Sequence, residues 1–218
     1  MDIPILYRDE SLVVCIKPVG MDSEGAGMPA VLAAELSAAE VFCVHRLDKA
    51  VGGVMVYALT KDAAAELSRQ IAGGGFRKSY LAVIHGCPDE SAAELRDLLF
   101  HDRAKNKSYV VSRKRAGVKE ASLSYRVLDS REDMSLMHIE LHTGRTHQIR
   151  VQFASRRHPL VGDVKYGSPR RDRPIALWSR ALAFTHPGTG VALRFHAVPP
   201  DVFPWNTFIT QEDKHALY

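Results

Sequence analysis

The chain has 218 residues, of which 46% are hydrophobic and 25% are charged, and its 29 Lys and Arg against 25 Asp and Glu give a net charge of +4. These proportions are typical of a globular protein and exclude a wholly disordered or fibrous one. At roughly 100–200 residues per domain, the length excludes a many-domain scaffold and predicts a single domain over residues 1–218.

The three cysteines, Cys15, Cys43 and Cys87, lie far apart in the sequence. Because they form no Cys-x-x-Cys pair, they argue against a disulfide framework and a thiolate zinc site, and they favour a reducing compartment. The first ten residues carry acids where a signal peptide has basic residues, and no apolar run approaches the roughly 18 residues of a membrane span. We therefore expect a cytoplasmic protein without membrane contact, and a monomer by default.

The first part of the chain predicts a hairpin, a helix and two strands. Residues 5–16 form two β segments around a polar turn, and 30–40 has the Ala, Leu and Glu content of a helix. Apolar runs at 41–44 and 54–59 predict strands. The second run follows Gly52-Gly53, a pair that would let a ligand or another backbone come close.

The middle of the chain predicts a helix followed by strands. Thr60 is a candidate N-cap for a helix that ends at the three glycines 73–75. Residues 78–85 are β-rich, and 121–128 with 134–141 predict an antiparallel pair around a polar turn.

The last third predicts one more helix and a hairpin. The helix opens at 143–146 and runs through Ser155, while 176–184 and 191–197 flank a His-Pro-Gly-Thr-Gly turn. Strands joined by tight turns, with few helices between them, favour an α+β fold. We expect a mainly antiparallel, mixed sheet flanked by a few helices.

Asp48 is a candidate for chemistry because of its place in the predicted structure. It lies just beyond the strand at 41–44, two residues after Arg46 and four before Gly52. This position is typical of a carboxylate at the rim of an active site. On the local sequence alone, however, an aspartate that caps a turn is the favoured interpretation.

The segment 143–150, with sequence TGRTHQIR, is a candidate anion site. It places a glycine and two hydroxyl side chains at a helix start, where free backbone amides attract anions, and Arg145 and Arg150 add positive charge. An ordinary capped helix with a basic face is the alternative. His142 and His147 are too irregularly spaced for metal ligands, so we expect no metal.

Two stretches of the chain are strongly basic. Residues 102–119 and 145–173 together hold 15 of the 29 Lys and Arg and 3 of the 25 Asp and Glu, a net charge of +12 that leaves −8 on the remainder. Such stretches are often solvated faces, but with Tyr109 and Tyr166 interleaved they suit a surface that neutralises phosphates. If the fold brings both to one face, we expect that face to bind nucleic acid.

Six motifs in series resemble the RluA-type pseudouridine synthase family, over nearly the whole chain. They are DE at 9–10 with KPVG at 17–20, HRLD at 45–48, KSYLAV at 78–83 with Gly86, TGRTHQIRV at 143–151, PLVGD at 159–163 with YG at 166–167, and Leu177-x-Ser179 with Phe184-x-His186-Pro187. One such match could arise by chance, whereas six in order are specific.

The resemblance implies an isomerase that converts uridine to pseudouridine in ribosomal or transfer RNA, without cofactor or metal. It implies that Asp48 is the essential carboxylate at the ribose and that Tyr80 stacks on the target base and handles the carbon-5 proton. Arg145 would pair with Asp48 and lower the pKa of that carboxyl. Ile149 would be the aliphatic residue against the base.

The same resemblance implies RNA contacts, because a stacked uridine must be flipped out before its ribose is accessible. We expect Arg46 to be the wedge that fills the vacated stack. The other RNA-binding residues that we expect are His45, His147, Gln148, Arg150, Lys114 and Arg115.

The chain departs from the family pattern at three places. Val51-Gly52-Gly53 stands where Thr-Ser-Gly is usual, Gln152 where a histidine is common, and Ser23-Glu24 where an apolar residue and His are usual. A non-catalytic RNA-binding or chaperone protein on the same fold is therefore the alternative. A glycoside hydrolase is weaker, since no second carboxylate is indicated. We also expect no N-terminal S4-type RNA-binding module.

Overall fold

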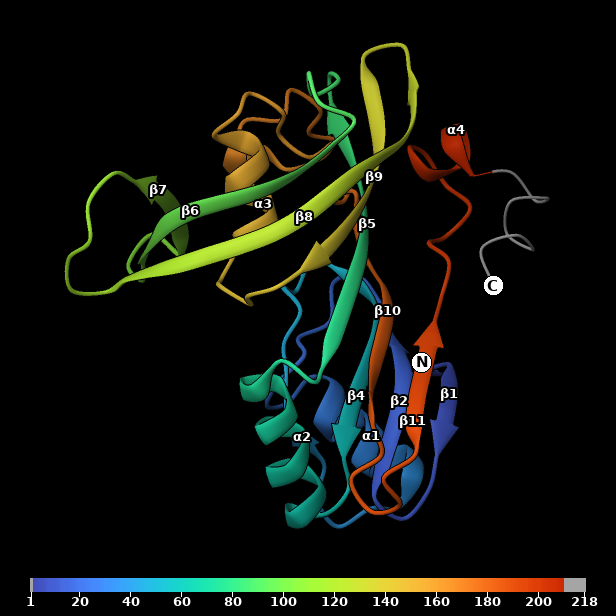
Figure 1. Cartoon of the computed structure of the whole chain (residues 1–218). Coiled ribbons are helices and arrows are strands. Elements are labelled where there is room, and N and C mark those ends of the chain that lie inside the picture. Colours follow the sequence, from blue (N-terminus) through green and yellow to red (C-terminus); the bar gives the residue numbers. More distant parts are fainter. Residues whose placement is uncertain (1, 210–218) are drawn as a thin grey trace. The chain divides into compact units, whose positions relative to one another are not determined.

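The computed structural model describes residues 2–209, which form two compact units (Figure 1). Of the described residues, 2–78 and Trp178–Pro199 make up the first unit, and Ser79–Leu177 with 200–209 make up the second. A single catalytic domain over residues 1–218 stays a prediction. Within the described residues, no helix is long and apolar enough to cross a membrane.

The first unit is a sheet with two helices. Its strands follow one another in the order β1 (Ile5–Arg8), β2 (Leu12–Lys17), β4 (Gly52–Ala58) and β10 (Leu177–Thr185), with β3 (Phe42–Cys43) against β4 and β11 (Ala192–His196) against β10. Strands β4 and β10 are parallel, and the other pairs are antiparallel. The helices are α1 (Met28–Leu36) and α2 (Lys61–Gly73).

The glycine pair of β4 makes the parallel contact possible. Gly53 has a φ of +121°, and a Cβ there would lie 2.2 Å from the Ser179 carbonyl oxygen. A Cβ on Gly52 would lie 2.6 Å from the ring of Trp178. The predicted close approach of another backbone is therefore confirmed, and the Trp178 ring accounts for a glycine at position 52.

The limits of α2 agree with the prediction. The Thr60 hydroxyl accepts a hydrogen bond from the Ala63 amide at 3.2 Å, as an N-cap does. Gly74 ends the helix in the left-handed conformation, with φ +78°.

The second unit is an antiparallel sheet with α3 (Gln148–Ala154), α4 (Trp205–Phe208) and the short helix η1 (Val164–Tyr166). Its strands lie in the order β5 (Arg77–His85), β9 (Met134–Leu141), β8 (Val118–Arg131), β6 (Ala92–Asp102) and β7 (Lys107–Val111). Helix α3 packs against β6, β7 and η1, and α4 lies against β8. In Figure 1, β6 and β8 run side by side to the end of the unit where β7 lies.

Two features of the second unit differ from the prediction. Strands β6 and β7 fall where no strand was predicted. Their sequences mix charged and apolar residues, so the sequence pattern does not indicate strands, and they are ordered by the ladders that β6 forms with β7 and β8. Helix α3 begins at Gln148, five residues later than predicted. His147 has a φ of +55°, a left-handed conformation that a helix cannot run through. The predicted α+β class, with a mainly antiparallel mixed sheet, is confirmed.

A carboxylate and a histidine join the two hairpins of the first unit. The Asp9 carboxylate accepts hydrogen bonds from the Tyr7 hydroxyl at 2.7 Å and from His186 Nε2 at 2.6 Å. His186 Nδ1 accepts from two backbone amides of the β10–β11 turn, so the imidazole is the neutral Nε2–H tautomer. Desolvation raises the pKa of Asp9, but the hydrogen bonds outweigh it and lower this pKa to about 2.

We expect Asp9→Asn to destabilise the protein at neutral pH and to matter less in acid. Because the folded-state pKa of Asp9 is depressed, its contribution is present above about pH 4 and is lost as the pH falls through 2. Urea unfolding of both proteins at a series of pH values measures the difference in unfolding free energy. The exposed neighbour Glu10 supplies the control Glu10→Gln, and a difference that stays constant down to pH 2 would contradict the assignment.

Candidate active site

The HRLD segment forms a loop between β3 and β4 that is held on several sides. Ser23 donates a hydrogen bond from its hydroxyl to the Leu47 carbonyl at 2.9 Å, and Arg46 pairs with Glu24 at 2.9 Å. Two of the residues by which this chain departs from the family pattern therefore contact the loop directly. Asp48 itself is half-buried, and its carbonyl accepts from the Val51 amide at 2.9 Å.

His45 is buried under the same loop. The Val56 amide donates to its Nε2 at 3.2 Å, and its ring lies against Phe76. Burial lowers the pKa of His45 to about 3, so the imidazole is neutral. This position anchors the loop to β4, and the predicted RNA contact of His45 stays a prediction.

Lys17 is a buried charge beside the Asp48 loop. Its side chain is inaccessible to solvent, and Nζ donates to the carbonyls of Pro18 at 2.9 Å, Met21 at 2.6 Å and Lys49 at 3.3 Å. Desolvation lowers its pKa to about 8, although the nearby carboxylates, Asp48 among them, raise it. The ammonium thus ties the loop after β2 to the residue next to Asp48. The sequence alone did not reveal this role, although a lysine at the end of an apolar run was the available signal.

In the second unit, Gln148 organises the loop that carries Arg145. Its side-chain oxygen accepts from the Thr143 hydroxyl at 2.7 Å and the Arg145 amide at 3.0 Å, and its amide nitrogen donates to the Ser122 carbonyl at 3.0 Å. The Arg145 side chain is exposed, and its Nε donates to the Glu120 carbonyl at 2.9 Å. Gln148 is buried, so these contacts give it a role within the protein.

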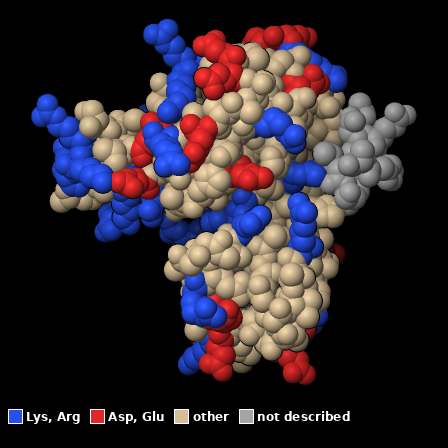
Figure 2. Space-filling view, viewed as in Figure 1, with Lys and Arg blue, Asp and Glu red and all other residues tan. Residues whose placement is uncertain are grey.

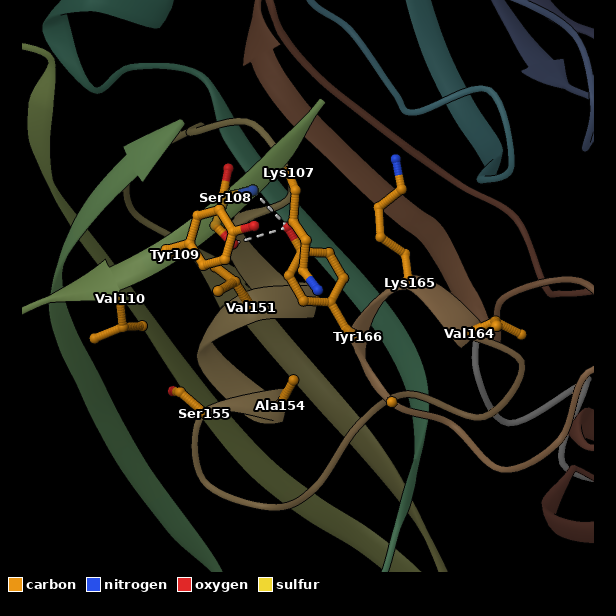
Figure 3. A pocket seen from close by; sticks show the side chains of 11 residues that line it. Lys107, Ser108, Tyr109, Val110, Val151, Ala154, Ser155, Val164, Lys165 and Tyr166 are labelled. Carbon is orange, nitrogen blue, oxygen red and sulfur yellow. Dashed lines mark hydrogen bonds between the residues drawn. The ribbon is translucent and has the colours of Figure 1, made fainter. Parts of the chain in front are cut away.

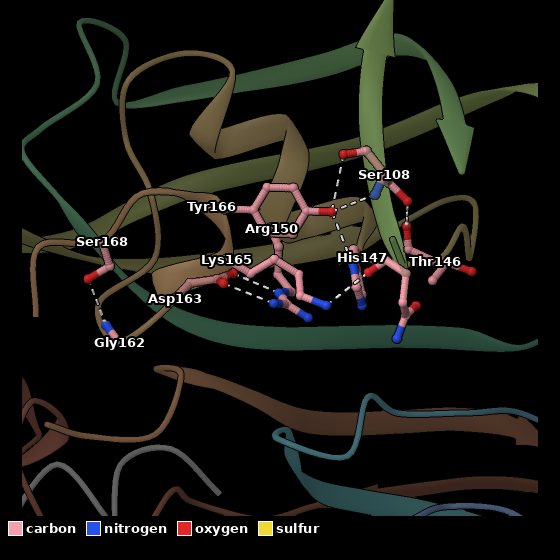
Figure 4. Close-up of polar contacts among 10 residues, drawn as sticks. Ser108, Thr146, His147, Arg150, Gly162, Asp163, Lys165, Tyr166 and Ser168 are labelled. Carbon is pink, nitrogen blue, oxygen red and sulfur yellow. Dashed lines mark hydrogen bonds and ion pairs between the residues drawn. The ribbon is translucent and has the colours of Figure 1, made fainter. Parts of the chain in front are cut away.

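Arg150 is also buried, in an ion pair with Asp163. Nε and Nη2 of Arg150 donate to the two oxygens of Asp163 at 2.6 and 2.9 Å, and both side chains are under a tenth exposed. The guanidinium lies over the ring of Tyr166, 5.1 Å from its centroid. Figure 4 shows this pair and the tyrosine joining α3 to η1.

The Tyr166 hydroxyl connects three segments of the second unit. It accepts from the Ser108 amide at 2.8 Å, donates to the Ser108 carbonyl at 3.2 Å and bonds His147 Nδ1 at 3.0 Å. Since a hydroxyl has one hydrogen, His147 must donate the third bond from Nδ1. The Ser108 hydroxyl in turn donates to the Thr146 carbonyl at 2.6 Å. Strand β7 is thereby fixed to the loop that carries Arg145 (Figure 4).

The two basic stretches meet in the second unit. Lys165 Nζ donates to the Asn106 carbonyl at 3.0 Å, in addition to the Tyr166 contacts. Lys114 and Arg115 are exposed in the turn between β7 and β8, where Lys114 pairs with Glu120 and the Arg115 guanidinium lies 4.9 Å from the Phe100 ring centroid. Figure 2 shows Lys and Arg gathered at this end of the unit.

The predicted site residues are thus divided between the units. The first unit carries His45, Arg46 and Asp48, and the second carries Tyr80, Lys114, Arg115, Arg145, His147, Gln148, Ile149 and Arg150. Tyr80 is buried on β5, and Ile149 is buried in the first turn of α3. The predicted pairing of Arg145 with Asp48 stays a prediction.

Comparison with known proteins identifies the family. Residues 11–155 match the family model described as RNA pseudouridylate synthase. The chain belongs to the RNA pseudouridylate synthase family. Its members are isomerases, and the predicted RluA-type membership and enzyme class are confirmed.

Individual relatives cover most of the chain. Ribosomal large subunit pseudouridine synthase D of Pseudomonas aeruginosa is 31% identical over all of this chain and 74% of its own length. Ribosomal large subunit pseudouridine synthase C of Escherichia coli K12 is 30% identical over 88% of this chain and 65% of its own length. The solved structure of human RNA pseudouridylate synthase domain containing 4 superposes with a TM-score of 0.77 at 26% identity, over 90% of this chain and 88% of that one.

We expect Asp163→Ala to destabilise the protein by about 3–5 kcal/mol, because it leaves the buried Arg150 guanidinium without its counter-charge. Urea unfolding measures the change. The control is Asp172→Ala, which removes an exposed partner of Arg173 and should leave the midpoint nearly unchanged. Equal effects of the two substitutions would show that the Arg150–Asp163 pair is dispensable.

Proposed function

We propose that this chain isomerises specific uridines of large-subunit ribosomal RNA to pseudouridine, with Asp48 as the catalytic carboxylate. The observation that carries the proposal is the family match over residues 11–155, which contains Asp48, Tyr80 and Arg145, each within one of the family's motifs. The ribosomal target is inferred from the names of two relatives, the ribosomal large subunit pseudouridine synthases D and C.

The reaction breaks the bond between ribose C1′ and uracil N1 and forms a bond between C1′ and C5 of the same base. The proton on C5 leaves and N1 gains one, so atoms and charge balance without an external reactant. Such a reaction needs a carboxylate at the sugar and a base for the C5 proton. In our proposal Asp48 acts at the ribose, and its half-buried position on a loop anchored by Lys17 and His45 keeps it oriented.

Tyr80 and Arg145 have the supporting roles. Tyr80 stacks on the target base and handles the C5 proton, and Ile149 packs against that base. The guanidinium of Arg145 holds Asp48 ionised, and the Gln148 contacts fix the backbone that carries it.

The target base must be flipped out of its stack, at a cost of a few kcal/mol. We propose that the exposed side chain of Arg46 fills the vacated position and that Lys114 and Arg115 hold flanking phosphates. Binding of this kind weakens as salt is raised, because phosphate neutralisation releases counterions.

Asp48→Asn should abolish pseudouridine formation while the protein remains folded, since the amide retains the shape but not the charge. Pseudouridine maps of total RNA from cells carrying the intact protein, Asp48→Asn or no protein give the readout. Asp62→Asn, an exposed carboxylate on α2, is the matched control. Maps of Asp48→Asn cells that retain every site of the intact protein would overturn the catalytic assignment, and lost sites in transfer RNA alone would overturn the ribosomal target.

Arg145→Ala should lower kcat by about 10²-fold, the usual size for loss of one electrostatic contact to a reacting group, with RNA affinity largely retained. Tritium release from RNA labelled at C5 of uridine measures turnover, and filter binding measures affinity. Arg145→Lys should restore part of the rate. Equal losses of turnover and affinity would count against a partnership with Asp48.

A further inference from the structure

A hollow of about 560 Å³ opens on the second unit, bordered by β7, α3 and η1. Its border includes Lys107 and Tyr109 from β7, Ser155 directly after α3, and Val164, Lys165 and Tyr166, which form η1 (Figure 3). Its volume lies within the 300–1,000 Å³ typical of sites for small ligands or single ligand groups. No catalytic residue that we propose lines it.

An ammonium group and two aromatic rings share this space. Lys107 Nζ lies 5.7 Å from the ring centroid of Tyr109 and 5.2 Å from that of Tyr166, within the range of cation–π attraction. Figure 3 shows the three side chains next to one another. The Tyr109 side chain is partly exposed, while Tyr166 is held by its hydroxyl contacts to Ser108. The Tyr109 ring is therefore the accessible stacking surface, whereas the Tyr166 ring also lies against the Arg150 guanidinium.

The charged side chains that line the hollow are all positive. Lys107 and Lys165 are on its border, and none of its described lining residues is acidic. Both lysines belong to the basic stretches that the fold brings together here. At the rim, Val110 and Val164 are 36% and 44% exposed, so apolar surface adjoins the charges.

Two aromatic faces, exposed apolar surface and two ammonium groups suit a nucleotide that is part of an RNA strand. A base can stack on an aromatic ring while the adjoining phosphates pair with lysines, an arrangement that tolerates different sequences. A free mononucleotide would lose the phosphate on one side of the base and therefore one of the two ionic contacts.

We propose that this hollow is an accessory RNA subsite, which holds an unpaired nucleotide outside the catalytic site by stacking on Tyr109 and by contacts of Lys107 and Lys165 to its flanking phosphates. The inference rests on the proposed function, because it assigns a position to part of the same RNA. Ser108 and Tyr166 line the hollow and also belong to the hydrogen-bond network that fixes the Arg145 loop, so an occupied hollow adjoins that network directly.

The decisive variant adds a negative charge to the border of the hollow. Val164→Glu places a carboxylate at an exposed border position of the hollow, where we expect it to weaken RNA binding about tenfold. The matched control is Val191→Glu, the same change at another exposed valine, in the β10–β11 turn of the first unit. Thermal unfolding verifies that both variants are folded, and oligouridylate of six nucleotides in fluorescence anisotropy is the probe.

Two further variants separate stacking from charge. Tyr109→Ala should weaken binding of the oligouridylate five- to tenfold with little change in its salt dependence. Lys165→Ala should reduce the slope of log affinity against log salt by about one, which corresponds to one phosphate contact. Uridine monophosphate should compete only weakly with the oligouridylate.

The outcomes are distinct from those that test the proposed function. Equal weakening by Val164→Glu and Val191→Glu would show a general charge effect and overturn the subsite, as would wild-type affinity of Tyr109→Ala. In either case Asp48→Asn would still abolish modification. If instead the hollow variants weaken binding as expected but Asp48→Asn retains activity, the subsite stands and the catalytic assignment fails.

Discussion

The buried ion pair between Arg150 and Asp163 is the interaction on which the second unit's functional surface depends. Two charges removed from water are costly unless they are paired in good geometry, and here both oxygens of the carboxylate are used. The pair fixes η1 against α3 and places the Tyr166 ring on the guanidinium. From Tyr166, hydrogen bonds reach β7 and His147, so the arrangement of strand, helix and loop follows from one satisfied charge pair.

The hydrogen bonds around Tyr166 and Ser108 hold both the basic strand β7 and the loop that carries Arg145. The basic side chains of β7 and its turns repel one another, and such strands would be poorly ordered alone. Ser108 is bonded through its amide, carbonyl and hydroxyl, which ties the strand to residues 38 and 58 positions later in the chain. The proposed phosphate contacts and the placement of Arg145 therefore depend on the same buried hydrogen bonds.

In the first unit, a single buried ammonium group holds two loops together. Lys17 satisfies three backbone carbonyls of two loops, and its positive charge lies close enough to Asp48 to interact with it. Nearby, Ser23 and Glu24 hold the HRLD loop through Leu47 and Arg46. Two of the residues by which this chain departs from the family pattern, Ser23 and Glu24, thus contact the loop that carries Asp48, the carboxylate proposed to be catalytic.

Local patterns were sufficient for several elements. The N-cap at Thr60, the left-handed glycine after α2 and the hairpins around polar turns are short-range features, since each depends on residues within a few positions. Strand β6 was not predicted because it is ordered by its ladder with β8, later in the chain, and β7 forms a hairpin with β6 that the charged residues around the turn did not indicate. The start of α3 was misplaced because the left-handed conformation of His147 is fixed by Tyr166, 19 residues later.

The sequence by itself determined the fold class, the family and the candidate residues Asp48, Tyr80 and Arg145, since these follow from the identity and order of short motifs. Only the tertiary structure decided that Gln148 and Arg150 of the TGRTHQIR segment face inward, to a loop and to a carboxylate. It also decided that the two basic stretches meet around one hollow. A motif records which residues are present, but burial and pairing depend on groups brought together across the chain.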